Sequence, residues 1–363
     1  MVKSLFATTS DLQAGTGGGI VSYNIALALK EVTDLKLILC SGSTDIAPCK
    51  DINPVAYALP PVPFLYDYIA SQYAIKVDIA HFRGDPFGLT TRILKFLNPD
   101  VKIVVDVPAH NLEESIREFQ NLGMRYPFVH MVDDRLWNFY ALHVRNADVV
   151  VAPSQLSANY IATSKKFARV FLHKPVIKII PHGVDMPKDV HYPEKFTVLH
   201  VGVNGVDKGQ IYLIRAWKLL QNKIDGELIL AGEGTEGWRS MNIKNLEALG
   251  RVKRVDKLYR DASIYVQPSV TEGWGLPVGE AMAHGKPVIV TEGTGAKDMV
   301  RNNYNGFIVP IRDPSAIARM IQYFYDNQSE IKRMGANARL TAKNYQWSNI
   351  RRKYQKLYGE LIG

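Results

Sequence analysis

Strand-like and helix-like segments alternate along the whole 363-residue chain, and this alternation limits its fold more than any other feature. In the first half, short apolar runs typical of buried strands are separated by stretches with apolar residues at three- and four-residue spacing, which indicate helices. This order favours parallel sheets with crossover helices. The strands predicted here are 4–8, 35–40, 77–82, 102–107, 148–152 and 176–180, and the clearest helices are 20–31 and 129–145.

A second series of the same kind starts at residue 196. Its predicted strands are 196–201, 227–231, 263–266 and 287–290, and its helices are 210–221, a stretch after 235, 276–284, 314–327 and 329–344. The segment 181–194 carries three prolines and is typical of a linker. We therefore predict an α/β protein of two Rossmann-like domains that face each other across a cleft, residues 1–185 and 186–345. The amphipathic tail 346–363 is predicted to be a helix that can pack back on the first domain.

The composition is that of a globular protein, with 47% hydrophobic and 22% charged residues. No stretch approaches the roughly 18 to 20 apolar residues of a membrane-spanning helix, and the N-terminal apolar run is too short for a signal peptide. Cys40 and Cys49 show no metal-ligand pattern. These features predict a cytoplasmic protein without structural disulfides.

The net charge of +9 and the pI near 9.3 are compatible with nucleic acid, anionic lipid or phosphorylated substrates as partners, or with solubility alone. The densest basic run, 351–356, lies on a predicted helix and is typical of a solvated face. Aromatic residues for base stacking are sparse beside the basic runs, so nucleic acid is the least favoured partner. Peripheral contact with an anionic membrane stays open.

The strongest motif is Glu-Gly-Trp-Gly-Leu-Pro-Val-Gly-Glu, which runs from Glu272 to Glu280 between a predicted strand and a predicted helix. Ligands of α/β proteins bind at such strand-to-helix turns. The amides of Gly275 and Leu276 at the helix start can point at a phosphate. Carboxylates accept hydrogen bonds from sugar hydroxyls, so the motif suits a nucleotide sugar. Two isolated glutamates near a helix start would mean much less, because the helix dipole favours them there anyway.

With its flanking residues, this motif makes the C-terminal half resemble the retaining glycosyltransferases of family 4, which have the GT-B fold. Their hallmark is two glutamates separated by seven residues, as in Glu272 and Glu280. The resemblance extends through Asp261-Ala262-Ser263, the Pro-Val-Ile-Val segment and Asn305-Gly306-Phe307, and it covers about residues 176–345. It implies that Glu272 contacts the donor sugar and that Glu280 holds the ribose. The first predicted domain would then serve the acceptor and the second would bind the nucleotide sugar.

The second signal is the loop after the first strand of the second domain, which contains Lys208-Gly209. A lysine there would lie over the donor diphosphate and neutralise the charge that builds up as the glycosidic bond breaks. The family pattern also has an arginine earlier in this loop, where this chain has Val203. Arg251 or Arg254 is a candidate replacement for that cation.

Two further segments are assigned by the same resemblance. The glycine-rich turn with Gly232 and Glu233 would flank the nucleotide, and its glycines allow backbone to approach the ligand. The run that starts with Arg251 and Val252 occupies the place where the family grips the base.

In the first half, the family has a Gly-Gly loop near the donor phosphates, matched here by Gly17, Gly18 and Gly19. A mobile surface loop is the alternative, and the segment has neither the acid of a dinucleotide site nor the lysine of a P-loop. His110 follows a predicted strand and resembles the polar residue that the family places near the reacting carbon. A structural histidine in a Pro-Ala turn is the alternative.

We therefore predict a glycosyltransferase that uses a UDP- or GDP-hexose donor with catalytic residues Glu272, Lys208 and His110. The resemblance implies retention of the anomeric configuration. No nucleophilic carboxylate stands out, so a covalent intermediate is not supported and front-face attack is expected. The absence of an Asp-x-Asp motif at a strand end predicts no bound metal or other cofactor. The acceptor, a glycan, lipid or small molecule, and the donor's base stay open. So do three alternatives: an epimerase, a phosphorylase, or a basic binding protein with a degenerate sugar site.

Overall fold

The structure is a computed structural model, and it describes residues 2–8, 17–39, 56–57, 76–83, 88–107, 112–124, 144–170 and 173–363. The chain divides into two compact units. Unit 1 comprises residues 1–109, 126–182 and 347–363, and unit 2 comprises residues 110–125 and 183–346. The sequence had placed residues 110–125 in the first domain, whereas the structure groups this segment with unit 2. Within the described residues, no helix is both long and apolar enough to span a bilayer.

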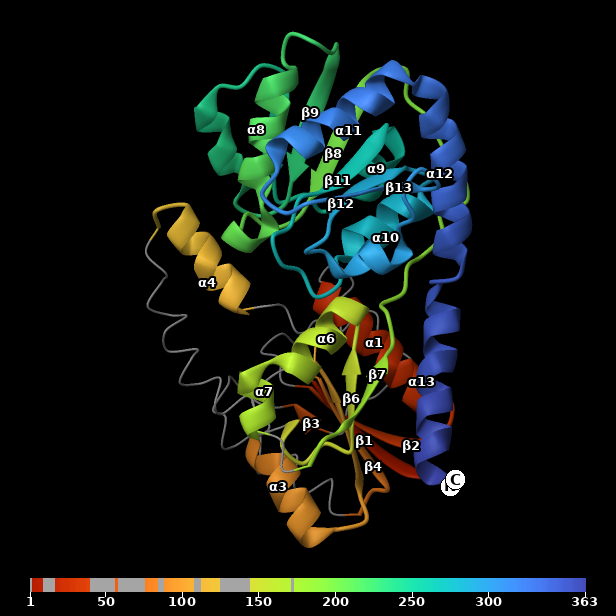
Figure 1. Ribbon diagram of the computed structural model, residues 1–363. Coiled ribbons are helices and arrows are strands. Elements are labelled where there is room, and N and C mark those ends of the chain that lie inside the picture. Colours follow the sequence, from red (N-terminus) through yellow and green to blue (C-terminus); the bar gives the residue numbers. More distant parts are fainter. Residues whose placement is uncertain are drawn as a thin grey trace. The chain divides into compact units, whose positions relative to one another are not determined.

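Unit 1 contains a parallel sheet in the order β3-β2-β1-β4-β5-β6-β7 (Figure 1). Its strands are β1 (Lys3–Thr8), β2 (Asp34–Leu39), β3 (Ala56–Tyr57), β4 (Ile79–Arg83), β5 (Lys102–Asp106), β6 (Val149–Ala152) and β7 (Val176–Ile179). Its helices are α1 (Gly17–Lys30), α3 (Gly88–Leu97), α6 (Gln155–Thr163), α7 (Lys165–Val170) and α13 (Trp347–Ile362). The strands lie within two residues of their predicted positions, except for the two-residue β3, which was not predicted.

The C-terminal helix α13 packs along α1 in unit 1. Its Tyr354 hydroxyl donates to Asp106 Oδ1 at 3.1 Å, and its Tyr358 hydroxyl bonds His81 Nδ1 at 2.7 Å. His81 Nε2 lies 2.7 Å from Asp106 Oδ2. All four side chains are buried. Because buried polar groups need partners, this network fixes the helix to one place on the sheet.

Unit 2 contains a second parallel sheet in the order β10-β9-β8-β11-β12-β13 (Figure 1). Its strands are β8 (Phe196–Val201), β9 (Gly226–Ala231), β10 (Leu246–Gly250), β11 (Ile264–Gln267), β12 (Val288–Thr291) and β13 (Gly306–Val309). Its α-helices are α4 (Leu112–Asn121), α8 (Gln210–Leu220), α9 (Asp256–Asp261), α10 (Leu276–Ala283), α11 (Pro314–Asp326) and α12 (Gln328–Lys343). The 3₁₀ turns are η1 (Val206–Lys208), η2 (Thr235–Met241) and η3 (Gly295–Met299).

One predicted helix of unit 2 takes another form, and strand β10 was not predicted, nor were helices α4 and α9. The segment after Thr235 forms the 3₁₀ turn η2 instead of an α-helix. Glycines flank and interrupt it, and it ends at Asn242 with a left-handed φ of 45°, so no long helical run can form. Strand β10 was missed because its sequence, Leu-Glu-Ala-Leu-Gly, contains good helix formers. Its place at the sheet edge is decided by pairing with β9.

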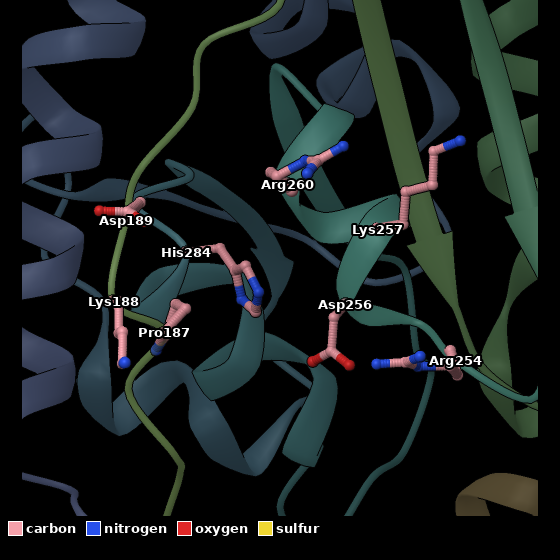
Figure 2. Close-up of a pocket in the computed structure, with 8 residues that line it drawn as sticks. All are labelled: Pro187, Lys188, Asp189, Arg254, Asp256, Lys257, Arg260 and His284. Atoms are coloured by element: carbon pink, nitrogen blue, oxygen red, sulfur yellow. The ribbon is translucent and has the colours of Figure 1, made fainter.

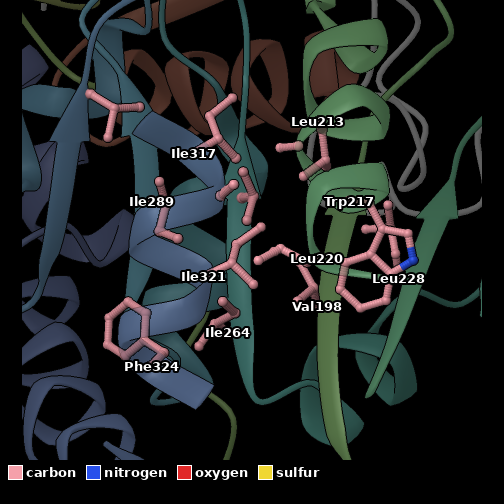
Figure 3. Packing of buried hydrophobic residues seen from close by; sticks show 14 of the residues in the cluster. Val198, Leu213, Trp217, Leu220, Leu228, Ile264, Ile289, Ile317, Ile321 and Phe324 are labelled. Carbon is pink, nitrogen blue, oxygen red and sulfur yellow. The ribbon is translucent and has the colours of Figure 1, made fainter. Parts of the chain in front are cut away.

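The core of unit 2 lies on both faces of its sheet, as expected for parallel strands. Successive residues of a strand point to opposite faces, and Val198 accordingly packs in one cluster while Leu199 packs in the other. The first cluster joins the sheet to α8 through Leu213 and Trp217 and to α11 through Ile317 (Figure 3). The second cluster joins the opposite face to α10 and α12. Both layers leave the carboxyl edge of the sheet free for loops.

Candidate functional site

The loop that carries Lys208 leaves the carboxyl end of β8 and is fixed by the neighbouring strand exit. Gly209 ends the turn η1 with a left-handed φ of 64°, and a Cβ atom on it would lie 2.1 Å from the carbonyl oxygen of Pro268. Only glycine fits this close approach. The amide of Val270 donates to the carbonyl of Asp207 at 2.8 Å. The loops after β8 and β11 are therefore held against each other.

Lys208 and Glu272 form an ion pair across these two loops. Their side chains are 26% and 19% exposed, so the pair is shielded but still accessible to a ligand. Burial by itself lowers the pKa of the Lys208 ammonium, but the carboxylates of Glu272 and Asp207 outweigh it and raise the pKa above its ordinary value. Lys208 is thus held as a cation at neutral pH.

Backbone hydrogen bonds to the segment after β12 fix the position of Glu272. Its amide donates to the carbonyl of Gly293, and its carbonyl accepts from the amide of Gly295, each at 2.9 Å. Two residues later, the carbonyl of Trp274 accepts from Ala296 at 2.7 Å. The loop around Glu272 is therefore built like a short strand pair.

Helix α10 begins directly after this loop. Gly275 precedes it with a left-handed φ of 97°, and Pro277 stands in its first turn. A Cβ atom on Gly275 would lie 3.5 Å from Cγ of Glu272, so the helix start touches the base of that side chain. The first amides of a helix have no partner inside it, and they attract anions. The structure thus places Gly275 beside Glu272, and Leu276 follows as the first residue of α10.

The second glutamate of the motif, Glu280, lies half-buried on α10. The Tyr259 hydroxyl of α9 donates to its Oε2 at 2.6 Å. Burial raises the pKa of the Glu280 carboxyl above its ordinary value, and the Tyr259 hydrogen bond partly opposes this rise.

Tyr265 of β11 is a buried residue whose pKa is affected by both glutamates of the motif. Burial raises the pKa of its phenol well above the ordinary value. The hydrogen bond to Val201 opposes this rise, and the carboxylates of Glu280 and Glu272 both add to it. Both carboxylates therefore raise the pKa of the same buried phenol.

The glycine-rich turn after β9 packs against the loop after β8. Gly232 has a φ of 136°, and a Cβ atom on it would lie 2.1 Å from the carbonyl oxygen of Gly202. The carbonyl of Glu233 accepts from the amide of Asn204 at 2.8 Å, while the Glu233 side chain is exposed. The glycines in this turn thus serve close backbone packing beside the Lys208 loop.

Arg251 and Val252 follow β10 at the same edge of the sheet. Arg251 is exposed and Val252 is half-buried. Val203, which stands where the family pattern has an arginine, is 58% exposed. Arg254 lines a cavity with Asp256 and His284, among other residues (Figure 2).

A buried polar network under the Lys208 loop was missed by the sequence analysis. His200 Nδ1 donates to the carbonyl of Val266 at 2.9 Å, so its Nε2 is the acceptor for Gln210 Nε2 at 3.2 Å. Gln210 also donates to the carbonyl of Gly202, and its Oε1 accepts from Trp238. The signal was present as a histidine inside an apolar strand and a glutamine directly after Lys208-Gly209.

Gly17, Gly18 and Gly19 lie in unit 1, where they form the start of α1 instead of the predicted loop. His110 lies outside the described residues. In the segments that the structure covers, no three His, Cys, Asp or Glu side chains gather as a metal site would require. Metal independence stays a prediction.

Residues 184–341 match the family model described as Glycosyl transferases group 1. This match lies within unit 2 and makes that part of the chain similar to group 1 glycosyltransferase domains. EpsD of Bacillus subtilis, a protein named as a glycosyltransferase, is 31% identical over 160 residues, which make up 42% of this chain and 42% of EpsD. An uncharacterized glycosyltransferase of Haemophilus influenzae is 26% identical over 364 residues, which make up 92% of this chain and 94% of that protein. The match thus spans less than half of EpsD and nearly all of the Haemophilus protein.

The chain also aligns over nearly its whole length with a solved structure, Anabaena HepE in complex with UDP-glucose. The TM-score is 0.74 at 18% identity, and the alignment covers 99% of this chain and 100% of HepE. At this identity the likeness shows the fold. The predicted GT-B fold and the predicted kinship with group 1 glycosyltransferases are confirmed.

Proposed function

We propose that the chain transfers a sugar from a nucleoside-diphosphate sugar to an acceptor hydroxyl, with retention of the anomeric configuration and without a bound metal. The observation that carries the proposal is the Lys208–Glu272 ion pair beside the first amides of α10. A fixed cation and open helix amides suit a diphosphate, and carboxylates suit sugar hydroxyls. The UDP-glucose complex of HepE supports a UDP-hexose as donor.

Each residue of this group has a role in the proposal. The Lys208 ammonium has three N–H donors, so it can keep its bond to Glu272 and still donate to diphosphate oxygens. The amides of Gly275 and Leu276 bind the same phosphates. Glu272 accepts hydrogen bonds from the donor sugar, and Glu280 accepts them from the ribose.

The remaining predicted residues complete the donor site in this proposal. Gly232 and Glu233 flank the nucleotide through their backbone, and Arg251 and Val252 lie next to the base. The glycines at 17–19 contribute amides to the phosphates. His110 hydrogen-bonds the sugar or stabilises positive charge in the transition state.

The transfer step breaks the bond between the anomeric carbon and the diphosphate oxygen and forms a bond from that carbon to the acceptor oxygen. The acceptor's proton goes to the departing phosphate oxygen on the same face, so the products are the glycoside and the nucleoside diphosphate. Glu272 is engaged by Lys208, which supports a binding role for this carboxylate rather than a nucleophilic one. The protein contributes positioning and stabilisation of the leaving diphosphate.

The acceptor in this proposal is a glycan, a lipid or a small molecule. The net charge of +9 supports peripheral contact with an anionic membrane, which would bring a lipid acceptor near the enzyme. We place the protein in the cytoplasm or at the cytoplasmic face of a membrane.

Thermal-shift and calorimetric titrations with UDP, GDP and ADP and their glucose conjugates test the donor, because a ligand that binds only the folded state raises its melting temperature. We expect stabilisation by one diphosphate and its sugar, with unchanged binding after treatment with EDTA. No stabilisation by any of these ligands would contradict the proposal.

Product analysis tests the reaction itself. Transfer gives free nucleoside diphosphate and an α- or β-glycoside with the donor's anomeric configuration, which proton NMR reports. A requirement for inorganic phosphate, or conversion of one nucleotide sugar into another without an acceptor, would instead identify a phosphorylase or an epimerase.

A further inference from the structure

Helix α4 is encoded between two strands of the unit 1 sheet but belongs to unit 2, where it packs against the turn η1 that ends at Lys208. None of the three residues of this turn is buried. The loop after β11 holds the turn through the bond from the Val270 amide to the Asp207 carbonyl. The packing of α4 against the turn adds a second support.

The contact between α4 and the rest of unit 2 centres on Glu118, whose side chain is 0% exposed. Its Oε1 accepts from the Tyr212 hydroxyl at 2.6 Å, and its Oε2 pairs with Nε of Arg312. Arg312 Nη1 also binds Glu114, one turn earlier on α4, at 2.6 Å. One guanidinium thus spans two carboxylates of one helix face.

The charges in this cluster are strongly coupled. Burial alone lowers the pKa of Arg312, but Glu118 and Glu114 outweigh it and raise the pKa above its ordinary value. Burial and the bond to Glu118 raise the pKa of Tyr212 to about 12. A fully buried carboxylate is tolerated only when it is paired in this way.

The backbone of Arg312, whose side chain makes this contact, has an unfavourable conformation. Its φ is 59°, a left-handed conformation that is unfavourable for a residue with a side chain. Such strain persists where surrounding contacts determine the conformation, and it is often found where a side chain must be aimed. Here the aimed group is the guanidinium that holds α4.

The link from Glu118 to Lys208 is short. Tyr212 lies in the first turn of α8, its amide donates to the carbonyl of Gly209 at 2.9 Å, and a Cβ atom on Gly209 would lie 3.5 Å from the Tyr212 ring. Lys208 is the residue before Gly209. The Tyr212 hydroxyl therefore ties α4 to the point where η1 passes into α8.

We propose that Glu118 is a positioning residue for donor binding: through Tyr212 it holds the η1 turn so that the Lys208 ammonium meets the diphosphate. This rests on the proposed function, since it assigns a partner on α4 to the same donor site. Glu118 itself does not touch the donor, and its effect passes entirely through Lys208.

A double-mutant cycle tests this with the nucleoside diphosphate that binds the parent protein, UDP first. Glu118→Gln keeps the size of the side chain but removes its charge, and we expect it to raise the Kd for UDP about tenfold. In a Lys208→Met background the same change is expected to have no effect on Kd. Equal effects in both backgrounds would mean a general structural role and would overturn the proposal.

Two further measurements keep the test decisive. Tyr212→Phe removes only the hydroxyl that bonds Glu118, and it is expected to raise the Kd for UDP by a similar factor. It replaces Glu118→Gln as the test if that variant does not fold. Gln120→Ala, on the exposed side of α4, is the matched control and is expected to leave Kd unchanged. Unchanged Kd in Tyr212→Phe would also overturn the proposal.

Hydrogen exchange separates failure of this inference from failure of the proposed function, because it needs no ligand. We expect the amides of residues 206–212 to exchange faster in Glu118→Gln than in the parent, with other strands of unit 2 unaffected. Unchanged exchange there would overturn the positioning role. Faster exchange together with a Lys208→Met variant that binds UDP normally would instead refute the assigned role of Lys208.

Discussion

Lys208 and Glu272 are 64 residues apart in the sequence, yet their side chains form an ion pair where the loops after β8 and β11 meet. If this pair binds the donor, Lys208→Met and Glu272→Gln are each expected to lower turnover by at least about 100-fold, the loss typical when one preorganised charge or donor is removed. Steady-state rates of nucleoside diphosphate release measure this.

The control for this prediction is Lys218→Met, which removes an exposed lysine of α8. It is expected to keep the parent's rate. Circular dichroism should show all three variants folded at the assay temperature. Near-normal transfer by Lys208→Met would show that Lys208 does not bind the donor.

Gly209→Ala is expected to destabilise the protein by about 2 kcal/mol or more, because it combines strained backbone with steric clash. The φ of 64° disfavours any side chain, and the new Cβ would lie 2.1 Å from the Pro268 carbonyl oxygen. Urea unfolding gives the free-energy change.

Gly237→Ala provides a comparison for this variant in the same unit. Its Cβ would meet nothing within 4 Å. Its stability is expected to change by less than about 0.5 kcal/mol. A similar loss in both variants would show that the close approach to Pro268 is not the cause.

Stability is expected to fall with acid because of His200. Burial lowers the pKa of its imidazole, the bond to the Val266 carbonyl opposes this and nearby Lys208 adds to it, so the pKa falls from 6.5 to about 4. Since the folded pKa is the lower one, the stabilisation is complete above pH 6.5 and is lost as the pH falls towards 4. At pH 5 the loss is about 2 kcal/mol.

Urea unfolding at pH 7.5 and pH 5 measures this effect. His200→Asn keeps a donor for the Val266 carbonyl and cannot titrate, so its stability should depend less on pH than the parent's. The exposed His191 is the control, and His191→Asn should retain the parent's full pH dependence. Identical pH dependence of stability in His200→Asn and the parent would exclude His200 as the cause of the acid-induced loss of stability.

Tyr259→Phe is expected to make donor binding more sensitive to acid. Burial raises the pKa of Glu280, and the Tyr259 hydroxyl opposes that rise by donating to the carboxylate. Without the hydroxyl, the pKa of Glu280 rises further. If the ribose binds only the ionised Glu280 carboxylate, donor binding persists above this pKa and is lost as the pH falls through it. The variant therefore loses donor binding at a higher pH than the parent.

Calorimetric titration of UDP between pH 8 and pH 5 checks this shift. Tyr304→Phe removes a phenol that is 37% exposed, and it should bind UDP with the parent's pH profile. A profile for Tyr259→Phe that coincides with the parent's would argue against contact between Glu280 and the ribose.

Much of the fold could be predicted because apolar runs alternate with helical periodicity. The run 196–201 has the composition of a buried strand, and it forms β8 over those residues. Strand β10 could not be predicted in this way, because its residues favour a helix and only its hydrogen bonds to β9 make it a strand. The membership of α4 in unit 2 also has no local signal, since it depends on Arg312, which follows almost 200 residues later.

The motif residues of the candidate site could be named from the sequence because the whole string between strand and helix, with its flanking residues, resembles a family motif. Glu272, Glu280 and Lys208 were named in this way. Tyr259 and His200 were not, because a tyrosine on a short helix and a histidine in an apolar strand look like core residues until their partners are known.

The sequence by itself determined the α/β class, the succession of most strands and helices along the chain, and the turns that carry the chemical groups. These features depend on local hydrophobic periodicity and on glycines at strand ends. Tertiary structure alone decided which side chains meet. The pairing of Lys208 with Glu272 and the burial of Glu118 against Tyr212 and Arg312 depend on which strands lie side by side in a parallel sheet. The lateral order of the strands is fixed by packing and by long-range hydrogen bonds, and these have no signal in the local sequence.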